Sequence, residues 1–231
     1  MNNKRSVVYL QAFYILKFKF NHFMKFSYLA LGDSYTIGES ISAEENFPSQ
    51  TVAILNKTAV GAGSRRQGFD NPTIIAKTGW TTDELDAAID AATIAKTYDI
   101  VSLLIGVNNQ YRGRSVNDYK IQFDHLLQRA IYFAGNRTNR VFVLSIPDWG
   151  VTPFADGRNR QQISSAIDAY NATASAICKQ YNSSFIDITT SQRLDANNAA
   201  YLTTDLLHPS GKEYTKWALQ LAAAIKVEIP A

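Results

Sequence analysis

Apolar residues recur along this chain in two alternating patterns. Short apolar runs of strand length lie at Phe26–Leu31, Thr73–Lys77, Ile100–Ile105, Val141–Ile146 and Ser184–Ile188. Stretches with helical periodicity follow near Glu44–Asn56, Thr82–Ala95, Val116–Ala134, Arg160–Tyr181 and Gly211–Val227. The runs 101–105 and 141–146 are apolar without alternation, which is typical of parallel strands that are covered on both faces.

This alternation predicts an α/β fold. Strands joined by right-handed helical crossovers build a three-layer α/β/α sandwich, here with a flavodoxin-like five-stranded parallel sheet. Thr81 with Glu84, and Ser210 with Glu213, have the spacing of a capping box at the start of a helix. No internal repeat or low-complexity tract interrupts the pattern, so residues 24–231 are expected to form a single domain.

The first 23 residues differ in composition from the rest and form an N-terminal extension of uncertain status. They carry four basic residues and no acid, and their apolar run from Val7 to Leu16 is shorter than the roughly 20 residues of a membrane span. A membrane-surface or signal-like role, an ordered extension and a functional start at Met24 all remain open. We expect no stable membrane span and a cytoplasmic location, with export as the alternative.

Charge and cysteine content exclude several classes of protein. The net charge of +3 comes from the first 23 residues, because removing their four basic residues leaves 19 basic against 20 acidic residues. The body therefore has no basic stripe of the kind that nucleic acids require. Cys178 is the single cysteine, so no intramolecular disulfide forms, and no Cys/His cluster has metal-ligand spacing. We therefore expect no structural zinc site.

Polar residues follow the ends of the predicted strands. The segments 32-GDS-34, 78-TGWT-81, 106-GVNNQ-110 and 205-DLLHPS-210 bring a serine, a glycine, an asparagine, an aspartate and a histidine to one edge of the sheet. Ligands of such sheets bind at the carboxyl ends of the strands. Of the three histidines, only His208 lies in such a loop with an acid three residues before it.

Acyl transfer is the chemistry that this set of residues favours. Ser34 is the candidate nucleophile, His208 the base that takes its proton, and Asp205 the acid that orients the imidazole. The backbone N–H groups of Ser34 and Gly79 and the side-chain amide of Asn108 are candidate donors to an oxyanion. Asp33 is expected to bond nearby amides in the turn. The serine does not lie in a G-x-S-x-G elbow, because Thr36 stands at the position of the second glycine.

These blocks resemble those of the SGNH hydrolases, also called the GDSL esterase/lipase superfamily. The segments 32-GDSYTIGE-39, 77-KTGWT-81, 106-GVNN-109 and 205-DLLHPS-210 occur in the family's order. The resemblance implies that Ser34, His208 and Asp205 form the triad. It also implies that Gly79 and Asn108 are oxyanion donors and that esters or thioesters are hydrolysed without a cofactor. Asn109 stands where the family commonly has aspartate.

Other interpretations accompany each of these assignments. Ser34 is also a favoured helix N-cap residue, Gly79 permits an unusual turn, and Asn108 can satisfy a loop. Short acyl esters are the first substrate hypothesis, and longer acyl chains, in lysophospholipase or thioesterase action, are the second. A flavodoxin-like phosphate- or nucleotide-binding module is the non-enzymatic alternative. Loops 107–115 and 147–160 are expected to shape substrate choice, with Trp80, Trp149 and Phe154 as candidate pocket walls and Arg112 and Arg114 as solvated or anion-binding side chains.

Overall fold

The protein is built around a five-stranded parallel sheet. The computed structural model describes residues 24–59, 67–94, 96–195 and 197–229. The sheet has the order β4-β2-β5-β6-β7. Its strands are β2 (Tyr28–Asp33), β4 (Thr73–Lys77), β5 (Ile100–Leu104), β6 (Val141–Leu144) and β7 (Ser184–Ile186). In chain order this arrangement reads 2-1-3-4-5, which is the flavodoxin-like order. The predicted fold class is therefore confirmed.

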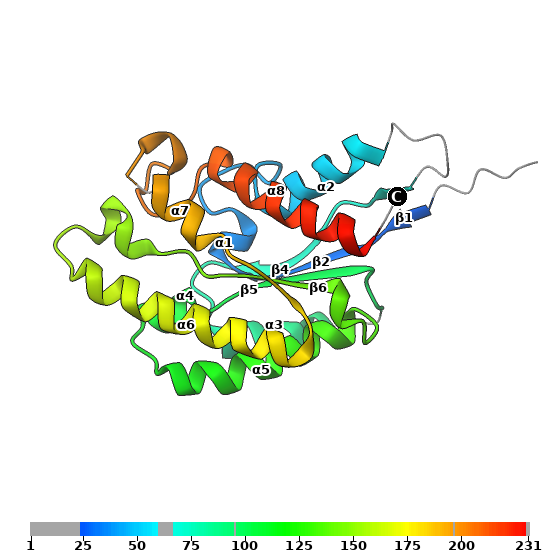
Figure 1. Ribbon diagram of the computed structural model, residues 1–231, viewed down its shortest axis with the longest axis horizontal. Helices are drawn as coiled ribbons and strands as arrows, with labels where there is room; N and C mark the ends of the chain where they lie inside the picture. The colour runs from blue at the N-terminus through cyan, green and yellow to red at the C-terminus, as the bar shows by residue number, and fades with distance from the viewer. Residues whose placement is uncertain (1–23, 60–66, 95, 196, 230–231) are drawn as a thin grey trace, which may run out of the picture.

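Helices cover both faces of the sheet, as Figure 1 shows. One layer contains α1 (Ser34–Ile37), α2 (Phe47–Ala59), α7 (Thr189–Asp195) and α8 (Gly211–Glu228). The opposite layer contains α3 (Thr82–Ala92), α4 (Val107–Tyr111), α5 (Val116–Phe133) and α6 (Arg160–Tyr181). None of the helices in the described part of the chain has the length and apolar character that a bilayer crossing requires.

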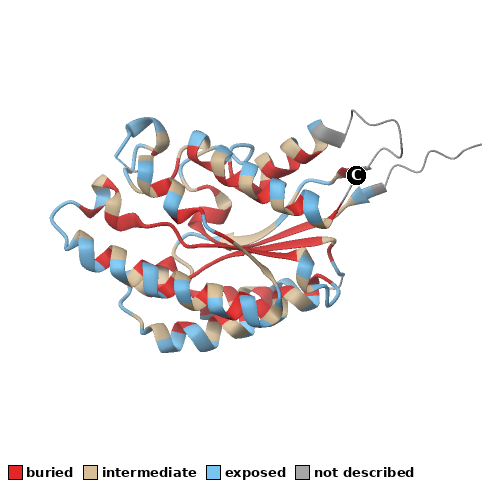
Figure 2. Ribbon diagram, in the orientation of Figure 1, coloured by how far each residue is buried: buried red, intermediate tan, exposed pale blue. Residues whose placement is uncertain are grey.

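Burial follows the order of the strands. Every residue of β2, β5 and β6 is buried, and these three strands appear red in the centre of Figure 2. The edge strands β4 and β7 are only partly buried. Continuous apolar runs predicted the central strands because a parallel strand between two helical layers has no solvent face. Cys178 of α6 lies in this core, with 1% of its surface exposed.

The ends of several elements differ from the predicted ones for local reasons. Strand β2 begins at Tyr28, two residues later than the predicted strand at Phe26. The N–H and hydroxyl of Ser27 both donate to the Asp99 carboxylate, at 2.7 and 2.8 Å, and this interrupts the strand. Phe26 instead belongs to β1 (Met24–Phe26), which pairs in parallel with β3 (Gln67–Phe69). Helix α2 begins three residues later than expected because the Asn46 side chain accepts the N–H of Ser49 at 2.9 Å.

The capping box predicted at Thr81 is present, and the one predicted at Ser210 is absent. The N–H of Thr81 donates to Glu84 at 2.8 Å, as predicted for the start of α3. At the start of α8, however, the Ser210 hydroxyl donates to the carbonyl of Ala200 at 2.8 Å. Glu213 is buried and accepts the indole N–H of Trp217 at 2.9 Å. A tertiary contact thus replaces the local one that the spacing predicted.

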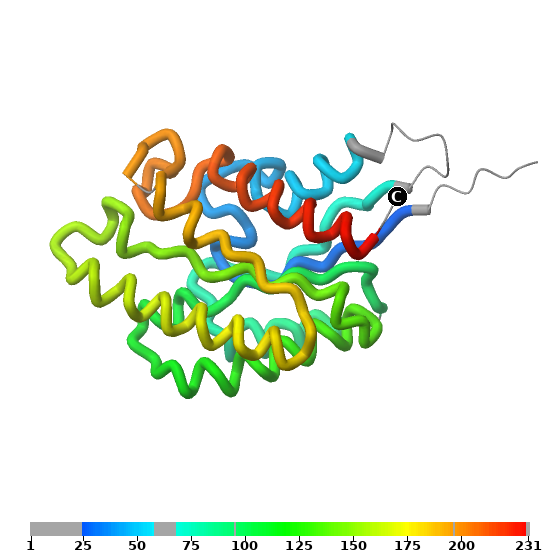
Figure 3. Tube along the Cα trace, in the orientation of Figure 1, coloured from blue at the N-terminus to red at the C-terminus, as the bar shows by residue number. Residues whose placement is uncertain are grey.

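The carboxyl ends of the strands meet at one edge of the sheet. The trace in Figure 3 brings the segment before α8 to the same end of the molecule as α1, although 174 residues separate Ser34 from His208. The expectation for residues 1–23 concerns a segment outside the described residues, and the single-domain boundary at residue 24 stays a prediction.

Gly32 makes a close approach at the end of β2 that a larger residue would prevent. A Cβ at this position would lie 2.1 Å from the Thr36 hydroxyl oxygen and 2.4 Å from the Leu104 carbonyl oxygen. Gly32→Ala is therefore expected to lower the free energy of unfolding by about 3 kcal/mol or more, measured by chemical denaturation. Adding Thr36→Ala should give little rescue, because the backbone carbonyl of Leu104 remains.

Gly157→Ala serves as the control for this substitution. A Cβ at Gly157 meets nothing within 4 Å, but the residue has a φ of +77°. Its loss should be about 1 kcal/mol, the usual penalty for a side chain in the left-handed region. Equal losses in Gly32→Ala and Gly157→Ala would contradict the close packing of β2 against α1 and β5.

Candidate active site

Ser34 is the first residue of the short helix α1, directly after β2. Asp33, not Ser34, is the N-cap residue, because its Oδ1 accepts the N–H of Tyr35 at 3.0 Å. The N-cap interpretation of Ser34 is therefore wrong, and the turn role expected for Asp33 is confirmed. The helix ends at Gly38, which has a φ of +78°. This arrangement leaves the Ser34 hydroxyl free to bond a residue from another part of the chain.

The carboxyl group of Asp33 is fully buried beneath this turn. Burial raises its pKa to about 7, and hydrogen bonds from the Tyr35 N–H and the Asn108 amide offset only part of that effect. Asp33 Oδ2 lies 3.4 Å from Asn108 Nδ2. The end of β2 and the loop after β5 are thus joined through one carboxyl group.

Asp205 organises the loop that precedes α8. Its Oδ1 accepts three hydrogen bonds, from the Thr203 hydroxyl at 2.7 Å and from the N–H groups of Leu207 and His208 at 2.9 Å each. Burial raises the pKa of this carboxyl group, but the bonds from Thr203 and His208 outweigh burial and hold the pKa well below its usual range. Asp205 therefore stays ionised near neutral pH.

A continuous hydrogen-bonded chain joins the two segments. His208 Nδ1 lies 2.7 Å from Asp205 Oδ2, and His208 Nε2 lies 3.0 Å from the Ser34 hydroxyl. Because an ionised carboxylate only accepts, its contact favours the imidazole tautomer with the proton on Nδ1. Nε2 is then the acceptor for the serine proton. The Tyr35 ring packs against the imidazole, with 5.0 Å between the ring centroids. Such a chain can make a serine oxygen nucleophilic.

Gly79 and Asn108 face the same cavity as Ser34 and His208. The cavity has a volume of about 210 Å³ and is lined by Ser34, Tyr35, Thr78, Gly79, Val107, Asn108, Tyr111, Trp149, Phe154, Leu207 and His208. Gly79 has a φ of +83°, and its carbonyl accepts Arg112 Nη2 at 2.6 Å. Asn108 Nδ2 donates to the Trp80 carbonyl at 3.0 Å. All five sequence-predicted site residues are thus brought together, since Asp205 lies directly behind His208.

Asn109 supports the loop after β5 in place of a carboxylate. It is fully buried, and its Oδ1 accepts the N–H of Thr82 at 3.0 Å while its Nδ2 donates to the Thr82 hydroxyl at 2.6 Å. The Thr82 hydroxyl in turn donates to Gln122 Oε1. An amide can accept and donate at once, so it satisfies both groups of Thr82 without placing a charge in the core.

Aromatic side chains form one wall of the cavity. Trp149 and Phe154 lie there as predicted, and Tyr111 joins them, with ring centroids 5.2 Å from Trp149 and 6.5 Å from Phe154. The indole N–H of Trp149 donates to Gln110 at 2.7 Å. Sequence reasoning missed Tyr111, although its place one helical turn after Asn108 was a usable signal.

Several candidate side chains have structural roles instead. Trp80 does not line the cavity but packs against the core. Arg112 pairs with Glu84 at 3.2 Å, and Arg114 pairs with Asp83. The sequence did not single out Arg158, whose guanidinium lies 5.2–5.4 Å from the ring centroids of Tyr111, Trp149 and Phe154. Arg158 does not line the cavity and packs on the aromatic wall.

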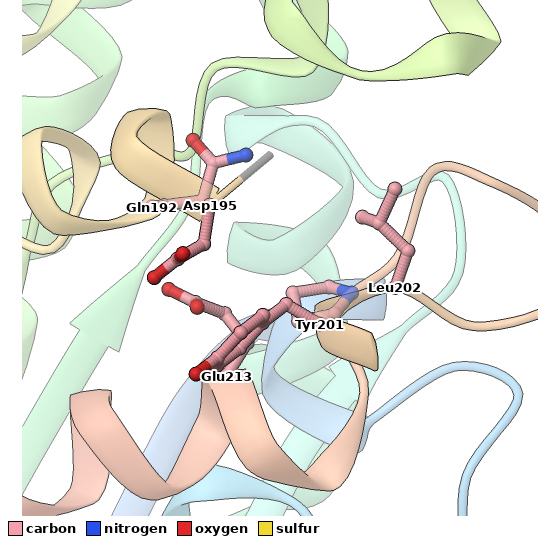
Figure 4. A pocket seen from close by; sticks show the side chains of 6 residues that line it. Gln192, Asp195, Tyr201, Leu202 and Glu213 are labelled. Atoms are coloured by element: carbon pink, nitrogen blue, oxygen red, sulfur yellow. The ribbon is translucent and has the colours of Figure 1, made fainter. Parts of the chain in front are cut away.

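A second, much smaller cavity lies behind the loop that carries His208. Its volume is about 10 Å³, and Figure 4 shows Asp195 of α7 and Glu213 of α8 close to Tyr201 in its wall. Lys216 bonds Asp195 at 2.9 Å and also pairs with Glu213. This space is too small for an organic ligand, and its acidic side chains are paired with Lys216. Within the described ranges, no three His, Cys, Asp or Glu side chains are placed to hold a metal ion.

The chain is similar to known hydrolases. A profile of the GDSL-like lipase/acylhydrolase family matches residues 30–216. Similar solved structures include TesA, with a TM-score of 0.64 and 16% identity over 87% of this chain and 98% of that one. A lipase/acylhydrolase from Enterococcus faecalis has a TM-score of 0.63 and 18% identity, over 89% of this chain and 97% of that one. A catalytic mutant of an acetylxylan esterase from Geobacillus stearothermophilus has a TM-score of 0.63 and 20% identity, over 90% of this chain and 95% of that one. No curated protein sequence matches.

The buried Asp33 carboxyl should give stability a characteristic pH dependence. Its pKa is about 7 in the folded protein but near 4 in an unfolded chain, so the folded state binds the proton more tightly. The free energy of unfolding of the wild type, relative to Asp33→Asn, should therefore fall as pH rises from about 4 to about 7, by at most about 1.4 kcal/mol per pH unit. Chemical denaturation at a series of pH values measures this difference.

Asp187→Asn provides a control of opposite sign. Burial raises the pKa of Asp187, but hydrogen bonds from Thr190, from nearby backbone N–H groups and from Ser145 outweigh burial and lower it. The wild type should therefore lose stability relative to Asp187→Asn only as pH falls below about 4. A difference between wild type and Asp33→Asn that stays constant from about pH 4 to about pH 7 would contradict the raised pKa of Asp33.

Proposed function

The chain belongs to the GDSL-like lipase/acylhydrolase family and is an ester hydrolase, and we propose that it cleaves small acyl esters through Ser34, His208 and Asp205. The observation that carries this proposal is the hydrogen-bonded chain from Ser34 through His208 to Asp205, with distances of 3.0 and 2.7 Å. Family membership sets aside the phosphate-binding module, which has no use for such a chain.

The proposed reaction has two stages. Ser34 attacks the ester carbonyl while His208 Nε2 takes its proton, and the imidazolium then protonates the departing alcohol. The products of this stage are the free alcohol and an acyl group bound to Ser34. Water, deprotonated by the same imidazole, then releases the acid and restores the serine. Asp205 stabilises the imidazolium throughout and does not take the proton.

The oxyanion of each tetrahedral intermediate needs donors fixed in advance. The N–H groups of Ser34 and Gly79 and the Nδ2 of Asn108 are the proposed set. The 3.0 Å bond to the Trp80 carbonyl holds the Asn108 amide in place. Its second contact, to Asp33, is long at 3.4 Å, so we assign the second amide hydrogen to the substrate oxygen. Arg112, bonded to the Gly79 carbonyl at 2.6 Å, orients the adjoining backbone.

The size of the cavity supports a small acyl group. About 210 Å³ is below the range of pockets that enclose drug-sized ligands, and the Trp149 indole in its wall is held by a 2.7 Å bond to Gln110. The acetylxylan esterase among the similar structures acts on a short acyl group, which agrees with this proposal. Longer acyl chains, as in lysophospholipase or thioesterase action, remain the second candidate, because Tyr111 and Phe154 of the cavity wall are also exposed to solvent and could contact a longer chain there.

Ser34→Ala tests the nucleophile directly. The variant should lose hydrolysis of 4-nitrophenyl acetate and covalent labelling by a fluorophosphonate, while its melting temperature stays close to that of the wild type. Loss of the hydroxyl removes the only atom that is proposed to form the acyl-enzyme. Ser42→Ala is the matched control, because Ser42 is an exposed serine of the same segment whose hydroxyl bonds Glu45 at 3.1 Å and not a triad residue. Retained labelling of Ser34→Ala would place the nucleophile elsewhere.

Asn108 and Asn109 permit a test of the oxyanion donor that is separate from the triad. Asn108→Ala should lower kcat by about 10²–10³-fold with little change in KM, since the bond forms in the transition state. Asn109→Ala removes the partner of the buried Thr82 N–H, so it should lower the free energy of unfolding by about 1–3 kcal/mol. At a temperature where Asn109→Ala is fully folded, its kcat should fall much less than that of Asn108→Ala.

The comparison of these two variants is decisive because they are adjacent in α4. Steady-state kinetics and denaturation should be measured on both proteins. A general collapse of the loop would lower kcat in both variants alike. If Asn109→Ala loses more activity than Asn108→Ala at a temperature where both are folded, the assignment of Asn108 as donor is wrong.

A further inference from the structure

Leu206, between the two loop residues proposed for the triad, has an unusual backbone conformation. Its φ is +61°, in the left-handed region that residues with a side chain rarely adopt. Residues held in this region tend to cluster where a site is shaped for function. The position therefore calls for an explanation of both the backbone and the side chain.

The backbone conformation follows from the bonds of Asp205. Its Oδ1 accepts the N–H groups of both Leu207 and His208 at 2.9 Å, while the N–H of Leu206 donates to the Thr203 carbonyl at 3.1 Å. This tight turn requires a left-handed residue at position 206 whatever its side chain. Glycine would adopt the conformation without strain. The turn alone thus does not explain a leucine here.

Core packing does not explain the leucine either. Leu206 is 46% exposed, whereas Leu207 beside it is partly buried and lines the cavity. The carbonyl of Leu206 accepts the N–H of Phe154 at 3.2 Å, so its backbone is bonded to that of a residue that lines the cavity and is 36% exposed. Leu206 is thus a strained, exposed apolar residue whose two neighbours, Leu207 in the chain and Phe154 through this bond, both line the cavity.

The chemistry identifies which part of a substrate reaches this point. In the proposed reaction the departing alcohol takes its proton from His208 Nε2, so the alcohol moiety lies on the His208 side of Ser34. The oxyanion donors Gly79 and Asn108 belong to loops after other strands. Leu206 belongs to the His208 side because it lies in the same loop, and its backbone bond to Phe154 connects that side to the aromatic wall of the cavity.

We propose that Leu206, together with Phe154, binds an apolar alcohol moiety and makes the enzyme selective for small acyl esters of such alcohols. This inference rests on the proposed function and specifies its substrate. A short acyl group occupies the cavity, and an alkyl or aryl group of the alcohol lies across the exposed surfaces of Leu206 and Phe154. In this proposal the leucine side chain supplies a contact to that group that glycine, although better suited to the backbone conformation, could not supply.

Two pairs of esters test this proposal and separate the alcohol side from the acyl side. The first pair is hexyl acetate and ethyl acetate, and the second is ethyl hexanoate and ethyl acetate, each followed by pH-stat below its solubility limit. Leu206→Gly should lower the kcat/KM ratio of hexyl to ethyl acetate by about fivefold. The ratio of ethyl hexanoate to ethyl acetate should stay unchanged. The same variant should melt about 2–4 °C higher, because the strain is relieved.

Two further variants control for stability and for side-chain chemistry. Thr93 has a φ of +46° at the exposed end of α3, so Thr93→Gly should raise the melting temperature without changing either ratio. Leu206→Met keeps an apolar side chain on the same backbone, so its alcohol ratio should stay within about twofold of the wild type.

Three outcomes would overturn the inference. Unchanged ratios in Leu206→Gly, in an enzyme whose Ser34→Ala variant is inactive, would refute the role of Leu206 and leave the proposed function standing. A fall in the acyl ratio instead of the alcohol ratio would refute the alcohol assignment. A wild type that hydrolyses none of the esters would remove the proposed function and this inference together.

Discussion

The buried carboxyl group of Asp33 is the interaction on which the rest of the site depends. It ends β2, caps α1 and approaches the Asn108 amide, so one side chain sets the relative positions of the serine turn and the loop after β5. Full burial makes its ionisation unfavourable, and the bond from the Tyr35 N–H and the long contact with Asn108 offset only part of that effect. Replacing it with a smaller group would leave the Tyr35 N–H without its side-chain partner, whereas Asn108 would keep its bond to the Trp80 carbonyl.

Different interactions hold the other two loops of the site, which carry His208 and Gly79, in place. The His208 loop is fixed from within, through three bonds to one oxygen of Asp205, and at its end through the Ser210 hydroxyl, which donates to the Ala200 carbonyl at 2.8 Å. The Gly79 loop is fixed from outside by Arg112, which also pairs with Glu84. Charged residues thus support the site while the cavity itself stays mainly apolar. This division keeps the reacting groups away from competing charges.

Much of the fold and the site followed from the sequence for identifiable reasons. The central strands were predictable because burial on both faces produces uninterrupted apolar runs, and Ser34, Gly79, Asn108 and His208 because parallel strands end at a common edge. Helices α1 and α4 were missed because four or five residues show no helical period. The three-residue strand β3 gave no signal for the same reason, and the end of β1 was predicted only as the start of β2.

Other features depend on contacts between distant segments and could not be read locally. Glu213 has the spacing of a capping residue, but its bond to Trp217 lies within a buried cluster that forms only after folding. The left-handed conformation of Leu206 depends on the Asp205 carboxylate, which accepts the N–H groups of both Leu207 and His208. Neither the residue types nor their spacing indicated these outcomes.

The single thiol of the chain has a practical consequence. Cys178 is buried in α6, and burial raises the pKa of its thiol to about 12, so the nucleophilic thiolate is almost absent in the folded protein. An alkylating reagent can therefore modify the protein only when α6 separates from the sheet. Because the sequence contains no second cysteine, the alkylation rate reports that opening alone. The native enzyme thus carries an intrinsic probe of its own core, without any engineered label.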